Sequence, residues 1–166
     1  MIKLKRSSCA DTRTCDWSKV SKDQLLRESR QHIGDVLQGL NFFAVMLRGA
    51  GLDHDWTKVK RIDEFHADFV TGFERKDWWK MHQREERHHF NSPEFVRDDV
   101  NLLDVLEQIV DGVMAGLARS GEYRCEPVSS ELLQKAYANT AKILIANVEV
   151  EPAGPAAGGK RHPSWG

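Results

Sequence analysis

Apolar residues at three- and four-residue steps are the feature that most constrains the fold of this chain. Ser21 stands at a helix N-cap position before the first such run, and Gly49 and Gly51 follow its last member. The sequence therefore predicts a helix that begins after Ser21 and ends at Gly49, and no alternating strand pattern competes with it. The run comprises Leu25, Leu26, Ile33, Val36, Leu37, Leu40, Phe43, Ala44 and Leu47.

Similar spacing continues along the chain and predicts an all-α fold. We expect further helices over residues 58–72, 77–88, 102–119 and 131–148, and a short one that begins at Pro93. Together they predict a single-domain bundle of five to six helices over residues 21–148. Residues 1–20 are polar without a period and predict a loosely ordered arm. Residues 149–166 are rich in Pro, Gly and Ala and predict a disordered tail.

Charge and hydropathy exclude several classes of protein. The 166 residues carry a formal net charge of −1, without the basic excess of a nucleic-acid-binding surface. The mean hydropathy is −0.53 and no long apolar run is present, so a membrane span is not expected. The N-terminus has no apolar stretch typical of a secretory signal. Three cysteines at scattered positions argue against a disulfide framework and for a reducing cytoplasm.

Histidines and acids supply the candidate chemistry. Asp111 interrupts an apolar stretch, and a buried carboxylate needs either a metal ion or a buried Lys or Arg as partner. His32 is either a ligand or a hydrogen-bonded core histidine, and Asp55 is either a ligand or the cap of the next helix. Imidazole and carboxylate groups without clustered cysteines suit Zn, Mn, Fe or Ni. The remaining candidate ligands are His54, His82, His88 and His89.

The order of these residues resembles a known family. His32, the His54-Asp55 pair and Asp111 follow the H…HD…D pattern of the HD superfamily of metal-dependent phosphohydrolases, and Lys58 completes an HDxxK string similar to that of its two-metal members. Further elements resemble a small HD-like family common in phages and bacteria. These are Glu28 one turn before His32, Trp79 and His82 in W-x-x-H, the His88-His89 doublet, and Glu107 and Asp111 in E-x-x-x-D.

The resemblance implies an all-α protein that holds one or two divalent transition-metal ions (Mn, Fe, Co, Ni or Zn). It implies His32, His54, Asp55 and Asp111 as ligands of the first ion, and His82, His88 and His89 as candidates for a second. The implied activity is hydrolysis of a phosphate ester or anhydride of a small molecule, a nucleotide by family analogy, in the cytoplasm, and the chain is expected to be able to form a homo-oligomer.

Other residues are expected to bind the substrate or move the proton. Lys58 follows the HD pair by one turn and is expected to contact phosphate, as are Arg61, Arg84 and Arg87, although charge runs of this kind are also typical of solvated faces. Trp56 is a candidate for stacking on a base. For the proton transfer, the candidates besides the His88-His89 doublet are Glu28 and Glu64.

Two other classes use the same residues. HD-like proteins can hold a mixed-valence di-iron centre that activates oxygen, so an oxygenase is one alternative. A metal-stabilised binding module without catalysis is the other. The metal content and the turnover of nucleotides distinguish these three functions.

Overall fold

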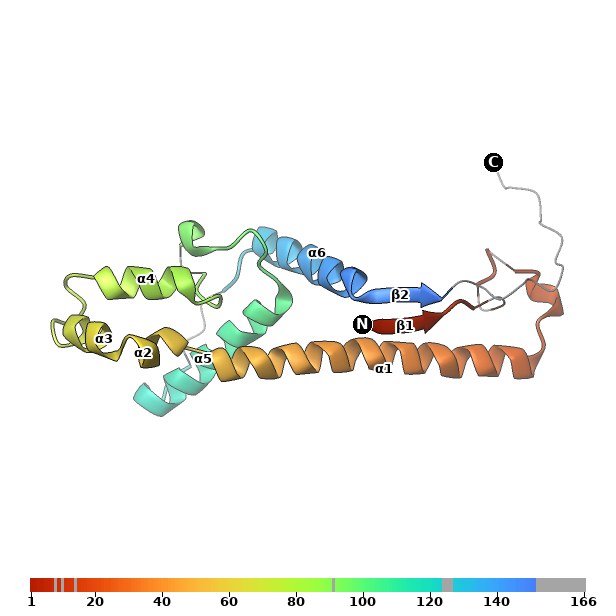
Figure 1. The fold of residues 1–166 in the computed structure, drawn as a ribbon, viewed down its shortest axis with the longest axis horizontal. Helices are drawn as coiled ribbons and strands as arrows, with labels where there is room; N and C mark the ends of the chain where they lie inside the picture. Colours follow the sequence, from red (N-terminus) through yellow and green to blue (C-terminus); the bar gives the residue numbers. More distant parts are fainter. Residues whose placement is uncertain (8, 10, 14, 91, 124–126, 152–166) are drawn as a thin grey trace. The chain divides into compact units, whose positions relative to one another are not determined.

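Helices make up most of the structure, a computed structural model that describes residues 1–7, 9, 11–13, 15–90, 92–123 and 127–151 (Figure 1). The all-α class predicted from the sequence is confirmed, with the addition of one short pair of strands. Two 3₁₀ turns, Trp17–Lys19 and Pro93–Phe95, complete the regular structure of these residues. In chain order, the elements are β1 (Ile2–Lys5), α1 (Lys22–Asp53), α2 (Trp56–Lys60), α3 (Ile62–Phe69), α4 (Asp77–Glu85), α5 (Leu102–Ser120), α6 (Ser130–Ala146) and β2 (Val148–Glu151).

The chain divides into two compact units, where the sequence predicted one domain. Met1–Phe42 belongs to one unit together with the chain from Leu144 onward, and Phe43–Ile143 forms the other. The boundaries fall inside helices, so that α1 and α6 each contribute residues to both units. An apolar period identifies a helix but does not tell which other elements cover it, so the sequence carries no signal for this division.

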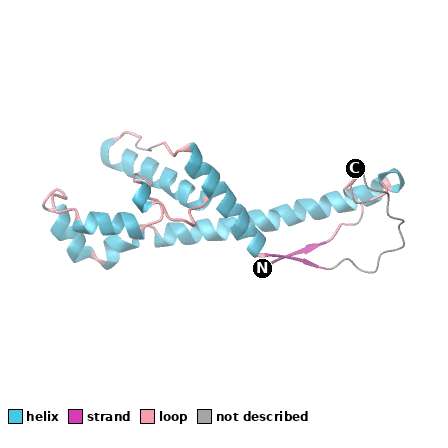
Figure 2. Cartoon of the chain, turned by 90° about the horizontal axis from the view of Figure 1, so that it is seen from above, coloured by secondary structure: helices cyan, strands magenta, loops and turns pink. Residues whose placement is uncertain are grey.

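The first unit contains a parallel pair of strands, drawn in magenta in Figure 2. Its register places Lys3 opposite Glu149 and Lys5 opposite Glu151. Opposite charges at facing positions stabilise a strand pair. Gln31 of α1 donates a hydrogen bond of 2.7 Å to the carbonyl of Lys5. Residues 2–5 and 149–151, predicted to belong to the loose arm and the disordered tail, are therefore in strands. The helix predicted to reach Val148 ends at Ala146, and residues 152–166 lie outside the described part.

Helix α1 begins where the sequence predicted but ends later. Ser21 Oγ accepts a hydrogen bond of 3.2 Å from the backbone N–H of Gln24, and the Gln24 side chain accepts one from the backbone N–H of Ser21. This reciprocal pair is a capping box. Gly49 and Gly51 do not end the helix, which continues to Asp53. Ile33 and Leu40 are 66% and 62% exposed, although their spacing predicted an inward face.

In the second unit, an aromatic cluster packs α3 against α4. The rings of Phe65 and Trp78 stack with their centroids 4.3 Å apart, and Trp78 is buried. The helix predicted over residues 58–72 is two helices, because the backbone leaves helical geometry at Arg61. This packing fixes α4, which carries His82.

Helix α5 is held at its N-terminus by side chains. Asn101 accepts a hydrogen bond from the backbone N–H of Leu103, and Asp104 accepts one from the backbone N–H of Asn101. Thr140 of α6 accepts a hydrogen bond of 2.8 Å from the backbone N–H of Leu102. Helix α5 carries two acids on one face, Glu107 and Asp111. No helix in the described part of the chain combines the length and apolar character needed to cross a membrane.

Candidate metal centre

Four segments of the second unit supply a cluster of imidazoles and carboxylates. The turn between α1 and α2 carries the His54-Asp55 pair, and Asp55 adopts a left-handed backbone conformation with φ of 57°. Helix α4 supplies His82, and the loop that follows it supplies His88 and His89. Helix α5 supplies Asp111. The sharp turn after α1 points both members of the HD pair toward the other segments.

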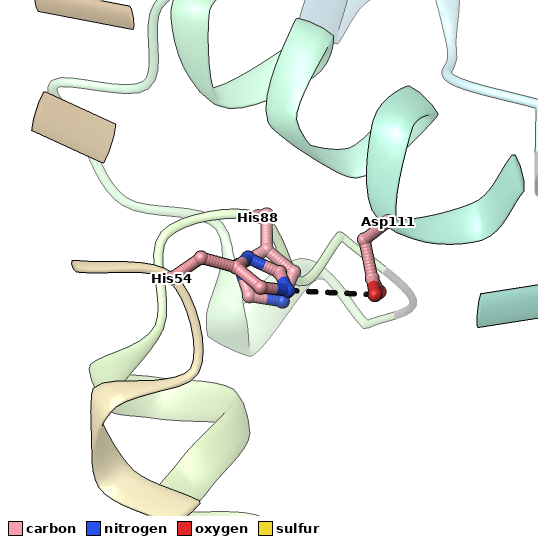
Figure 3. Close-up of side chains that lie close together, drawn as sticks. All are labelled: His54, His88 and Asp111. Atoms are coloured by element: carbon pink, nitrogen blue, oxygen red, sulfur yellow. Dashed lines mark ion pairs between the residues drawn. The ribbon is translucent and has the colours of Figure 1, made fainter. Parts of the chain in front are cut away.

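His54, His88 and Asp111 form the first group (Figure 3). Each offers one ligand atom, and these atoms all lie within 4.8 Å of one another. His54 Nε2 lies 3.5 Å from Asp111 Oδ1. Behind the two rings, Glu107 Oε1 lies 2.9 Å from His54 Nδ1 and 3.0 Å from His88 Nδ1. A carboxylate only accepts hydrogen bonds, so Glu107 favours the Nδ1–H form of His54 and leaves its Nε2 toward the centre. The contact of Glu107 with His88 is an ion pair by distance, and His88 Nδ1 makes no hydrogen bond within the described residues.

Asp55, His82 and His89 form the second group. His82 Nε2 lies 3.4 Å from Asp55 Oδ1 and 2.9 Å from His89 Nε2. Asp55 also faces the first group, because its Oδ2 lies 3.4 Å from His54 Nε2. The two groups therefore share Asp55 as a neighbour, which is an arrangement that can hold one or two ions.

The electrostatics differ between the two groups. Asp111 and Glu107 accept hydrogen bonds from His54 and raise its pKa to about 10. The partnership with His54 lowers the pKa of Asp111 to about 2. In the second group, burial lowers the pKa of His82 to about 3, and the adjacent His89 and Lys58 add to this effect. Burial, followed by the adjacent His88, lowers the pKa of His89 to about 4. The first group thus attracts positive charge, and the second holds neutral imidazoles.

Buried polar atoms test whether these residues fit a metal ion. Asp55 Oδ1 and His88 Nε2 are buried, and neither makes a hydrogen bond within the part of the chain that the structure describes. Leaving such atoms unpaired costs about 1–3 kcal/mol each. Imidazole nitrogens and carboxylate oxygens are the ligands that suit Mn, Fe, Co, Ni and Zn. The donor set and the unpaired atoms both fit a divalent transition metal.

Lys58 lies next to this cluster. Its ammonium group donates a hydrogen bond to Asp55 Oδ2, and its side chain is 24% exposed. A partly exposed cation beside the candidate ligands is in reach of an anionic group that approaches from solvent.

His32 and Glu28 are not among the residues of the two groups. His32 is exposed on α1 and belongs to the first unit, and Glu28 lies one turn before it. Within the described residues, the first position of the H…HD…D pattern is therefore in neither group, and His88 lies beside His54 and Asp111.

Two of the arginines that were predicted to contact phosphate form ion pairs with acidic residues. Arg87 binds Asp104 through two hydrogen bonds of 2.7 and 2.9 Å. Arg61 pairs with Glu64, which is exposed.

Of two further substrate candidates, Arg84 is exposed on α4 and Trp56 is half-buried. Lys60 lies over the ring of Trp56, 4.9 Å from its centroid, which covers one face of that ring. Of the predicted substrate contacts, Lys58 is the one that contacts a candidate ligand among the ion pairs and hydrogen bonds of the described residues.

Three residues at the centre were not among the predicted site residues. Glu107 has a signal in the sequence, since it lies one helical turn before Asp111 and so shares its face. Thr57 and Glu86 are buried beside His82, but they are 29 positions apart and only the fold brings them together.

Comparison with known proteins yields no relative: no family model, curated protein or solved structure matches this chain. Functional inference therefore depends on the geometry of the centre.

Proposed function

We propose that this protein is a metal-dependent phosphohydrolase of the HD type. The observation that supports the proposal is the convergence of two ligand groups on Asp55, whose Oδ1 atom is buried without a hydrogen bond in the described structure. His54, His88 and Asp111 would hold one divalent ion, and Asp55, His82 and His89 a second. Such an ion polarises a phosphoryl oxygen and lowers the pKa of water toward neutrality.

The residues of the chain would have distinct roles in this reaction. Lys58 would exchange its hydrogen bond with Asp55 for one with the anionic phosphate of the substrate. Its ammonium group would then offset the negative charge that develops on the phosphate. Glu107 would hold the rings of His54 and His88 in place. When only the first group holds an ion, His89, which is neutral and partly exposed, would move the proton.

The proposed substrate is a nucleotide, and the proposed location is the cytoplasm. The near-neutral charge of the chain supports a small-molecule substrate over a nucleic acid, and its three scattered cysteines support a reducing compartment. The choice of a nucleotide depends on the resemblance to HD proteins and on the cation Lys58 beside the centre.

Elemental analysis of the purified protein, followed by a nucleotide panel, tests the proposal. We expect bound transition metal and release of phosphate or pyrophosphate after addition of Mn, Co, Ni, Mg or Zn. The Asp55→Asn variant should lose both. Two irons with a visible absorption band and no hydrolysis would support the oxygenase instead. Bound metal with nucleotide binding but no turnover would support a binding module, and a protein without metal affinity would contradict all three.

A further inference from the structure

A buried chain of polar groups lies behind His82, on the side away from the metal centre. Thr57 and His82 are fully buried and Glu86 is 4% exposed. Thr57 Oγ1 lies 2.7 Å from His82 Nδ1 and 2.6 Å from Glu86 Oε1. The same Glu86 oxygen accepts a hydrogen bond of 3.0 Å from the backbone N–H of Thr57. These three residues come from α2, α4 and the residue that follows α4.

The number of hydrogens fixes the direction of these bonds. Glu86 Oε1 accepts from the backbone of Thr57 and, as a carboxylate oxygen, also accepts from its hydroxyl. The hydroxyl has one hydrogen, so Thr57 Oγ1 must accept from His82. His82 Nδ1 therefore carries the hydrogen, and its Nε2 presents a lone pair.

That lone pair faces the metal centre. His82 Nε2 lies 3.4 Å from Asp55 Oδ1, which has no hydrogen to donate, and 2.9 Å from His89 Nε2. In the metal-free chain the contact with His89 is then a hydrogen bond that His89 donates, and an ion bound by both rings would take the place of that hydrogen. His82 Nε2 and Asp55 Oδ1 are two acceptor atoms that lie 3.4 Å apart, so both can bind the same cation.

We infer that Thr57 and Glu86 are positioning residues that lock His82 in its Nδ1–H tautomer and so present its Nε2 atom as a metal ligand. The inference deepens the proposed function and depends on its metal centre. The contacts that fix the tautomer of His82 differ from those of His54 and His88, whose rings contact the carboxylate of Glu107 directly. For His82, a neutral hydroxyl stands between the ring and the carboxylate.

A purely structural role is the competing explanation, because Glu86 also accepts a backbone N–H in the first turn of α2. Two variants separate these roles. Thr57→Val has nearly the shape of threonine and keeps the backbone N–H but lacks the hydroxyl. Thr57→Ser keeps the hydroxyl. Thr71→Val is the matched control, because the Thr71 hydroxyl donates its hydrogen bond to the carbonyl of Asp68 and not to a histidine.

The direct measurement is the tautomer of His82 in the full chain after chelator treatment, by nitrogen NMR with ¹⁵N-labelled histidine. We expect a hydrogen on Nδ1 in the wild type, in Thr57→Ser and in Thr71→Val. Thr57→Val should lose this preference and populate the Nε2–H form. An unchanged Nδ1–H tautomer in Thr57→Val would overturn the inference.

Titration with Mn²⁺ or Zn²⁺ is the second measurement. Loss of an outer-shell partner weakens metal binding by about 10- to 100-fold, and we expect this loss in Thr57→Val, with rescue in Thr57→Ser. Equal affinity in Thr57→Val and wild type would also overturn the inference. If the wild type binds no metal, the proposed function fails, while the NMR measurement still decides whether Thr57 sets the tautomer.

Discussion

At the scale of single residues, Asp55 combines a special backbone with a central position. Its φ of 57° is a conformation that Asp and Asn tolerate better than other non-glycine residues. Asp55→Asn therefore keeps the turn and removes the negative charge that both ligand groups share. We predict that this variant loses at least about 10-fold in metal affinity, since even outer-shell changes cost that much. Calorimetric titration with Mn²⁺ measures the loss.

Asp55→Ala separates the backbone from the carboxylate. Alanine is disfavoured in the left-handed region, so Asp55→Ala should be less stable than Asp55→Asn by about 1 kcal/mol of unfolding free energy. The two variants should lose the same amount of metal affinity. Denaturant unfolding followed by circular dichroism gives the difference. Wild-type metal affinity in either variant would remove Asp55 from the set of ligands.

His54 makes metal binding depend on pH. Its pKa is raised to about 10, so below that pH its ring is an imidazolium that donates through Nε2 to Asp111. A metal can bind Nε2 only after that proton leaves, whereas His82 and His89 are neutral above their lowered pKa values. We therefore predict that affinity rises about tenfold per pH unit between roughly pH 7 and 9, with about one proton released for the ion at the first group.

Titration calorimetry in two buffers of different ionisation enthalpy counts the protons. The His54→Gln variant provides the control, because its amide cannot release a proton in this range. Metal affinity that stays constant from pH 7 to 9 in the wild type would contradict the position of His54 as a ligand.

At the scale of elements, Arg87 ties the loop that carries His88 and His89 to the start of α5. Its guanidinium binds the nearly buried Asp104, which also caps that helix, and pairs with Asp99 at 3.0 Å. We predict that Arg87→Ala costs about 3 kcal/mol of unfolding free energy, because it leaves a buried carboxylate without its partner. Denaturant unfolding of the full chain is the measurement.

Arg84→Ala is the matched control for this change. Arg84 is exposed on α4, and its removal should change stability by less than about 0.5 kcal/mol. Equal effects of the two substitutions would mean that the pair of Arg87 and Asp104 contributes little.

The sequence predicted where helices begin better than where they end. Ser21 and Asn101 accept the hydrogen bonds expected of N-caps, because this geometry is set by a few adjacent residues. Gly49 and Gly51 were expected to end α1, but a glycine also permits a helix to continue. The strands Ile2–Lys5 and Val148–Glu151 were missed because four alternating residues are a weak signal until their partner is known.

For the centre, the sequence supplied most members but not their arrangement. The HD pair, the later histidines and Asp111 were recognised by type and spacing, and the structure brings them together. His32 was included from the order of the pattern alone, and it belongs to the other compact unit and to neither ligand group. Thr57 and Glu86 carry no local signal, since a threonine and a glutamate gain this role only through contact across the fold.

At the scale of the whole molecule, a bound ion would link segments that are distant in sequence. The two ligand groups draw on the turn after α1, on α4, on the loop after it and on α5. An ion that binds the folded chain and not the unfolded one stabilises it by about 2.7 kcal/mol at a concentration 100 times its Kd. For a chain of this length, that corresponds to an increase in Tm of roughly 5–10 °C.

We therefore predict that the full chain unfolds at a higher temperature with excess Mn²⁺ or Zn²⁺ than with a chelator, and that Asp55→Asn shows a much smaller difference. Differential scanning calorimetry under both conditions provides the values. The comparison needs no substrate, so it tests the metal centre separately from the hydrolysis. An equal Tm with metal and with chelator in the wild type would mean that the imidazoles and carboxylates around Asp55 form a hydrogen-bonded cluster and not a metal site.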